Sequence, residues 1–138
     1  MKIKSLLVLL TLGLSACTGG KYAGVPKQYN ELISQTMQTA GSNAKELKKA
    51  LKQTPTTQRE GMAFLISYMP ERDAKALTAD FLLENVDYAY KARAEFPWAK
   101  EVPNDIFLND VVAYVNLNEK RENWRKDFYE RFKKYVAN

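Results

Sequence analysis

From Pro26 to the end of the chain, apolar residues recur at the three- and four-residue spacing of an α-helix. The clearest run is Met62, Leu65, Ile66 and Met69, at positions i, i+3, i+4 and i+7. Prolines and glycines separate the runs, none of them alternates apolar and polar residues, and no Asn-Gly or Asp-Gly hairpin turn occurs. We therefore predict an all-α fold, a single small bundle of about five to six helices.

The spacing places six helices along the chain. They are expected over about residues 26–40, 42–53, 57–69, 77–95, 103–115 and 120–136. The run at 77–95 has the widest apolar band, which predicts a central position in the bundle. Residues 116–119, Asn-Leu-Asn-Glu, form a predicted turn, because asparagine tolerates the left-handed backbone.

Large aromatic residues in the last two predicted helices fall at helical spacing. We interpret four of them as packing residues that hold these helices together across the asparagine-rich turn: Phe107, Tyr114, Trp124 and Phe128. Trp98 lies between two helices in Phe-Pro-Trp, a segment that could hold a ligand but more often closes the end of a bundle. Both tryptophans are thus assigned to packing, with ligand stacking as the alternative.

The first sixteen residues differ in kind from the rest. Lys2 and Lys4 precede the uncharged apolar run Leu6–Leu14, which is shorter than the roughly 20 residues needed to span a bilayer. This pattern is typical of a cleaved signal peptide. The segment Leu-Ser-Ala-Cys that ends at Cys17 resembles the lipobox of bacterial lipoproteins, which implies cleavage before Cys17 and a lipid anchor on its thiol.

The predicted organisation is a signal peptide at 1–16, a flexible glycine-rich tether at 17–25 and an α-helical domain at 26–138. Cys17 is the only cysteine, so no intrachain disulfide can form. The residues after Cys17 lack an acidic cluster of the kind that resembles a surface-export signal in Bacteroidetes lipoproteins. We therefore expect a cell-envelope protein on the outer membrane that faces the periplasm.

Charge argues against nucleic acid as a partner. Removal of residues 1–16 takes away two lysines and no acidic residue, so the mature charge is (21 − 2) − 16 = +3. These charges are spread along the chain, and no nucleic-acid-binding motif is present.

The chain carries little catalytic chemistry. It contains no histidine, the commonest general base and metal ligand, so neither a catalytic triad nor a metal site is expected and no cofactor is predicted. Asp105 and Asp110 do not share a helix face well, while Asp80, Glu84 and Asp87 do. We interpret these three as a solvated acidic face; a hydrolase that uses Glu84 or Asp87 is the least favoured hypothesis.

Three segments together resemble a known family. They are Phe64–Pro70 within GMAFLISYMPERD, Val102–Tyr114, and Asn118–Phe128 within NEKRENWRKDF. In this order they resemble the helical N-terminal region of transglutaminase-like lipoproteins, found largely in the Bacteroidetes, over roughly residues 57 to 135. Ala113 departs from the pattern, which has proline there. The residues that carry the resemblance, interpreted as structural, are Pro70, Pro103, Phe107, Tyr114, Asn118, Glu119, Trp124 and Arg125.

The resemblance implies that a papain-like catalytic domain with a Cys–His–Asp triad normally follows the helical region. No residue of this chain matches that triad, so no catalytic role is carried over. The first hypothesis is therefore a non-catalytic, membrane-anchored accessory domain of a transglutaminase-like protein. The alternative is a stand-alone lipoprotein that binds a cell-envelope partner: a protein, peptidoglycan or a glycan.

Overall fold

The computed structural model describes residues 22–115 and 119–136, and these segments form helices and turns without a β-strand. The prediction of an all-α fold is confirmed. Five of the helices have nine residues or more: α1 (Asn30–Ala40), α2 (Ala44–Gln53), α3 (Arg59–Ser67), α5 (Ala79–Glu95) and α8 (Arg125–Val136). The short ones are α4 (Glu71–Ala74), α6 (Pro97–Lys100) and α7 (Asn104–Ile106). The predicted signal peptide (residues 1–16), Cys17 and Asn118 lie outside the described residues.

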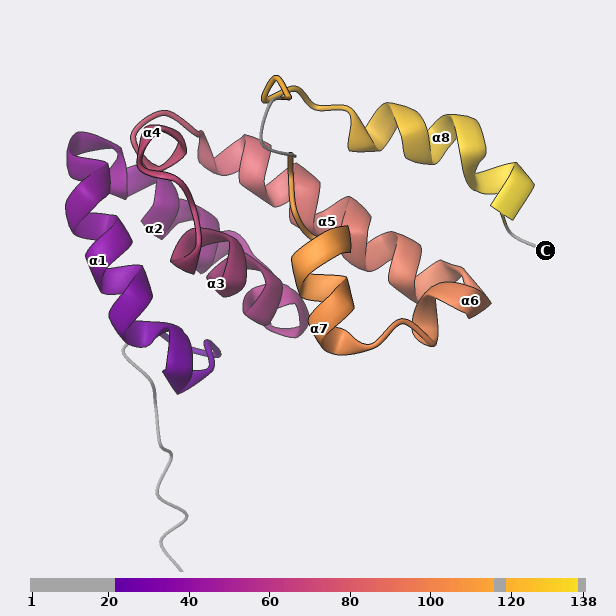
Figure 1. The fold of residues 1–138 in the computed structure, drawn as a ribbon, viewed down its shortest axis with the longest axis horizontal. Coiled ribbons are helices and arrows are strands. Elements are labelled where there is room, and N and C mark those ends of the chain that lie inside the picture. The colour runs from indigo at the N-terminus through magenta and orange to yellow at the C-terminus, as the bar shows by residue number, and fades with distance from the viewer. Residues whose placement is uncertain (1–21, 116–118, 137–138) are drawn as a thin grey trace, which may run out of the picture.

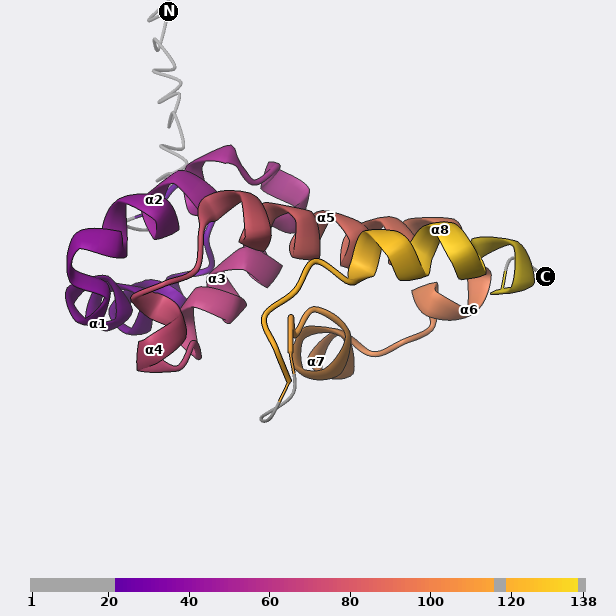
Figure 2. The same cartoon turned by 90° about the horizontal axis from the view of Figure 1, so that it is seen from above.

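The molecule is elongated, with α5 running through its middle (Figure 1). Helices α1 to α4 form the part of the molecule at the N-terminal end of α5, and within it α1 packs on α2, α3 and α4; α6 and α8 lie along the second half of α5 (Figures 1 and 2). At a rise of 1.5 Å per residue, the 17 residues of α5 span about 25 Å. The central position predicted for this helix is confirmed by its packing against α2, α3, α6 and α8.

Local signals in the sequence set several helix ends. Gly41, with a φ of 56°, ends α1 in a backbone conformation that other residues rarely adopt. The Thr78 hydroxyl caps α5 by accepting a hydrogen bond from the Phe81 amide at 3.2 Å. Pro70 and Pro103 stand immediately before α4 and α7. A backbone amide at this position has no acceptor within the helix, so proline, which lacks the amide hydrogen, costs no helix hydrogen bond there.

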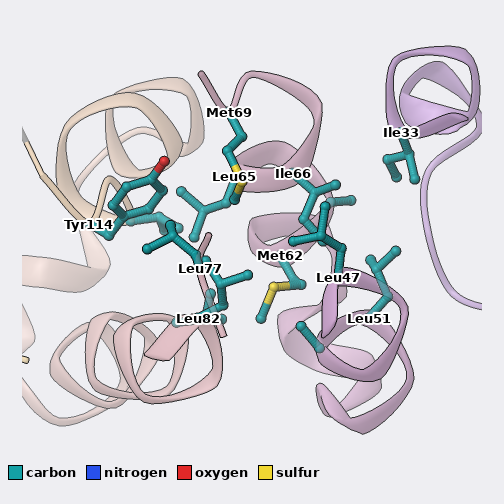
Figure 3. Close-up of a cluster of buried hydrophobic side chains, with 14 of the residues drawn as sticks. Ile33, Leu47, Leu51, Met62, Leu65, Ile66, Met69, Leu77, Leu82 and Tyr114 are labelled. Carbon is teal, nitrogen blue, oxygen red and sulfur yellow. The ribbon is translucent and has the colours of Figure 1, made fainter. Parts of the chain in front are cut away.

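The main core lies between α1, α2, α3 and α5, and aliphatic residues from all four helices fill it (Figure 3). Gly61 lets α3 approach α5 closely. Its amide donates a hydrogen bond to the Tyr90 hydroxyl at 3.2 Å, and a Cβ atom at this position would lie 2.7 Å from the Tyr90 ring. A second, smaller cluster of Phe96, Ala99 and Tyr129 seats α8 on α5 and α6.

Two predicted helices are shorter in the structure. The helix expected over 103–115 ends in a π-helical turn, Phe107–Val111, closed by a hydrogen bond from the Val112 amide to the Phe107 carbonyl at 2.8 Å. The helix expected from about Lys120 begins at Arg125. In the first case the Arg125 side chain bonds to the carbonyls of Val111 and Ala113, and in the second the Arg121 side chain bonds to Asp73. These long-range hydrogen bonds hold the backbone in a non-helical path. No helix in the described ranges is both long and apolar enough to cross a membrane.

Candidate functional site

The last residue of the π-helical turn and the four residues that follow it, 111–115, are named here the strap. The strap runs between α4 and the start of α8, and its residues bond to both. Tyr114 anchors the strap: its ring packs edge-on against Phe81, and its hydroxyl donates to the Asp73 carboxylate at 3.0 Å. The Asp73 side chain is only 5% exposed. Burial and the neighbouring carboxylate both raise the pKa of the Tyr114 phenol, so the hydroxyl remains a donor at neutral pH.

Arg121 completes this anchor from the other side. Its guanidinium donates two hydrogen bonds to the two carboxylate oxygens of Asp73, at 2.9 and 2.8 Å. Such a bidentate pair is stronger and more directional than a single contact. Asp73 in α4 thus ties together the strap and the segment that leads into α8, 41 and 48 residues along the chain.

Arg125, the first residue of α8, holds the strap from its other end. One of its guanidinium nitrogens donates to the carbonyls of Val111 and Ala113, and Nε donates to the Asn85 side chain at 3.1 Å. Burial lowers the pKa of Arg125 to about 10. The Trp124 indole nitrogen donates to the Tyr114 carbonyl at 3.2 Å.

Between the strap and the start of α8 lies a groove of about 760 Å³. Its lining is Asp110, Val111, Ala113, Val115, Glu119, Lys120, Glu122, Trp124, Arg125 and Phe128. Its apolar lining consists of the side chains of Val111, Ala113, Val115, Trp124 and Phe128. This groove is the candidate site.

A row of aromatic rings continues the groove along α8. Trp124, Phe128, Phe132 and Tyr135 contact one another in series, with ring centroids 5.5, 5.5 and 6.5 Å apart. They are 37%, 53%, 48% and 69% exposed. This aromatic face lies beside the surface through which Tyr129 fixes α8 to the bundle.

The exposure of this face corrects the sequence interpretation of Trp124 and Phe128. Both were expected to be packing residues between helices, and Trp124 does bond to the strap, but both rings remain open to solvent. The physical reason is that α8 contacts the bundle on one side only, and Tyr129 and Val136 occupy that side. Among the described residues, no helix or loop covers the neighbouring row of rings from Trp124 to Tyr135.

The other residues that carry the family resemblance have structural positions. Phe107 is buried. The Tyr90 ring packs edge-on against it with the two ring centroids 4.9 Å apart, and the guanidinium carbon of Arg93 lies 4.2 Å from the centroid of the Phe107 ring. Pro70 and Pro103 precede helices, as described above. Glu119 is exposed on the groove rim.

Trp98 and the acidic residues follow the sequence interpretation in part. Phe96 is buried and stacks on Trp98, with a centroid distance of 5.9 Å, but Trp98 itself is 55% exposed. Asp80 and Asp87 are exposed, and Asp80 pairs with Lys49 at 3.0 Å. The interpretation of a solvated acidic face therefore holds for these two residues.

Three residues that build the site were missed in the sequence: Asp73, Asn85 and Arg121. Asn85 carried a signal, because a polar side chain interrupts the apolar band of the central helix and a buried amide needs partners. Asp73 and Arg121 lie in the segments that resemble the family, but their pairing across 48 residues has no local sequence signal.

The described residues contain no group of three or more His, Cys, Asp or Glu side chains placed to hold a metal ion. The groove has apolar and charged side chains in its lining, and the Arg125 and Trp124 side chains hold the backbone of the strap beside it. Comparison of the chain with protein-family models, curated proteins and solved structures gives no match.

Proposed function

We propose that the chain is a non-catalytic, lipid-anchored accessory domain of the cell envelope that docks a transglutaminase-like catalytic domain through the groove and the aromatic face of α8. The single observation that carries the proposal is the row of four exposed rings that begins with Trp124, just before α8, and continues along that helix. The family resemblance supplies the class of partner, and the lipobox-like segment supplies the anchor.

The size of the exposed face supports docking. An aromatic side chain offers roughly 200 Å², and about half of each of the four rings is open, which gives on the order of 400 Å² of contiguous apolar surface. Patches of this size on soluble proteins are often functional. Covering the face would contribute about 10 kcal/mol at ~25 cal/mol per Å², a gross figure comparable with the estimated 4–15 kcal/mol that association costs.

The position of the face also favours a protein partner. The described chain enters the fold beside α1, while α8 lies toward the opposite end of the long axis (Figures 1 and 2). A lipid anchor on Cys17 would tether the α1 end, and α5 would hold the aromatic face about 25 Å farther along the molecule. The face is therefore placed to meet another domain.

The residue types available support a non-catalytic role. The whole sequence has no histidine, and its one cysteine is the proposed site of lipidation. Asp80 is exposed and pairs with Lys49, and Asp87 is an exposed carboxylate at an open hollow, where it accepts a hydrogen bond from Gln58.

Site-specific photo-crosslinking in cells tests the proposal. Phe132→p-benzoylphenylalanine in the full chain places the crosslinker on the aromatic face, and the matched control is the same replacement at Tyr68, an exposed ring outside the groove. We expect Phe132, and not Tyr68, to crosslink to a domain that contains a Cys–His–Asp triad. Equal crosslinking from both positions, or crosslinks from Phe132 to lipid alone, would refute docking through this face.

The alternative, a stand-alone lipoprotein that binds another envelope component, rests on the same exposed face. The same experiment separates the two functions, since crosslinks from Phe132 to an envelope protein without the triad, or to peptidoglycan, would identify the alternative.

A further inference from the structure

We infer that a second pocket, between the α3–α4 corner and the strap, binds a single carboxylate attached to an apolar body. This pocket, named here the α4 pocket, has a volume of about 520 Å³ and, of the described residues, shares Ala113 and Val115 with the groove. Small-molecule sites commonly enclose about 300–1,000 Å³, with mostly apolar walls and a few polar groups that orient the ligand. The inference rests on this pocket and not on docking through α8.

Apolar side chains of α3 and of the corner after it line the α4 pocket. Leu65 and Met69 are buried, whereas Tyr68 is 60% exposed and therefore lies at the mouth. The rings of Phe64 and Tyr68 contact each other with their centroids 4.9 Å apart. Since Tyr68 is mostly open to solvent, the apolar body of a ligand that packs on its ring buries further apolar surface, which favours binding.

The charged side chains that line the α4 pocket leave one positive charge in excess. They are two guanidinium groups, from Arg72 and Arg121, and the carboxylate of Asp73. Arg121 donates two hydrogen bonds to Asp73, so these two charges offset each other. Tyr114 also lines the pocket and stays neutral, because burial and Asp73 raise the pKa of its phenol. The charge of Arg72 is therefore the one that a ligand can offset.

Arg72 is placed to bind an anion at the mouth of the α4 pocket. Its side chain is 65% exposed, and its Nε lies 3.5 Å from the Asp73 carboxylate. Within the described part of the chain, no acceptor is hydrogen-bonded to its two terminal nitrogens. A guanidinium group presents such nitrogens as a planar fork, which a carboxylate accepts through both of its oxygens.

The same charges disfavour other ligands. A cation is repelled by the excess positive charge. A phosphate monoester carries a charge of about −1.5 to −2 at neutral pH, so it brings more negative charge than Arg72 offsets, close to the buried Asp73. A flat anionic membrane surface can reach Arg72, but it leaves the buried inner wall with Leu65 and Met69 uncovered. A single carboxylate with an apolar body satisfies both parts of the pocket.

Saturation-transfer NMR on the full chain in neutral phosphatidylcholine nanodiscs tests the inference, with empty nanodiscs as the background. The probes are 3-phenylpropanoic acid, N-acetylleucine and N-acetylphenylalanine, each beside its own amide, and acetate, which lacks an apolar body. We expect at least one acid to bind about tenfold more tightly than both its amide and acetate, because hydrogen bonds to charged groups are the stronger ones.

Two variants separate the charged part of the α4 pocket from the apolar part. Arg72→Gln should lower the affinity for the acid about tenfold, to that of the amide. Tyr68→Ala should lower the affinities for acid and amide alike, by about threefold. Both side chains are exposed, so the fold should be retained, which circular dichroism checks. The matched control is Arg131→Gln, an exposed arginine of α8 outside the pocket, which should leave both affinities unchanged.

The inference is wrong if no acid binds more tightly than its amide, if acetate binds as tightly as the acids, or if Arg72→Gln leaves the preference for the acid intact. Binding to phosphatidylglycerol vesicles that depends on Arg72, and that the acids do not displace, would also overturn it and assign Arg72 to a lipid surface.

The same chemistry occurs in a free acid and at the C-terminus of a peptide that ends in an apolar residue. Acetyl-alanyl-alanyl-phenylalanine, compared with its C-terminal amide, distinguishes the two sources. Binding of the peptide acid about tenfold tighter than that of N-acetylphenylalanine, with no gain for the peptide amide, would support the α4 pocket as a site for a chain terminus. Binding no tighter than that of N-acetylphenylalanine would support it as a site for a free acid.

Discussion

Replacement of Arg125 by methionine removes the side chain that fixes the strap to α8. The guanidinium donates three hydrogen bonds, to two backbone carbonyls and to the buried Asn85 side chain. Hydrogen bonds to a charged group contribute about 1.5–3 kcal/mol each, so the gross stabilisation is roughly 4.5–9 kcal/mol.

Burial of the charge opposes this gain. Desolvation lowers the pKa of Arg125 from its ordinary value to about 10. Since each pKa unit corresponds to about 1.36 kcal/mol, burial of the charged guanidinium costs roughly 3 kcal/mol. The difference leaves a net contribution of about 1.5–6 kcal/mol. For a domain of this size the Arg125→Met chain should therefore melt roughly 10 °C below the parent.

Urea denaturation followed by circular dichroism measures the loss. In a Trp98→Phe background Trp124 is the only tryptophan, and its fluorescence is then a local probe of the same junction. The matched control is Arg131→Met on the same helix, where an exposed ion pair with Asp127 contributes at most about 0.5 kcal/mol. Arg125→Lys should fall between Arg125→Met and the parent, because one ammonium cannot reproduce the planar fork that reaches all three acceptors.

If Arg125→Met unfolds within about 1 kcal/mol of the parent, Arg125 does not hold the strap. A Lys variant as stable as the parent would show instead that charge alone, without the geometry of the guanidinium, accounts for the effect.

Two further predictions concern Tyr114 and Cys17. Burial and the Asp73 carboxylate raise the pKa of Tyr114. The folded state therefore keeps a phenolic proton that the unfolded chain releases near pH 10. As a result, the stability linked to this group is complete below about pH 10 and falls as the pH rises above it. Urea denaturation on both sides of that pH should show a smaller alkaline loss for Tyr114→Phe than for the parent, and equal losses would refute the linkage. Cys17→Ala should abolish metabolic labelling with an alkyne fatty acid and release the chain from the membrane fraction, whereas retained label would place the lipid elsewhere.

The residues of the candidate site differ in how far the sequence revealed them. Tyr114, Trp124 and Arg125 stand in segments that the sequence analysis singled out, and all three contact the strap or belong to it. Asp73 and Asn85 were not found, because each acquires its role from an arginine 40 or more residues away. A pairing of that kind depends on where the helices place the two side chains.

The sequence by itself determined the all-α class, the position of most helices and the central place of α5, because helix formation and its interruption by proline and glycine are local properties of the chain. The tertiary structure decided which apolar stripe of α8 is buried. Both the stripe of Tyr129 and Val136 and the row from Trp124 to Tyr135 have helical spacing, but α5 and α6 cover only the first. Periodicity shows that a helix has an apolar side, and only the arrangement of the other helices determines whether anything packs against it.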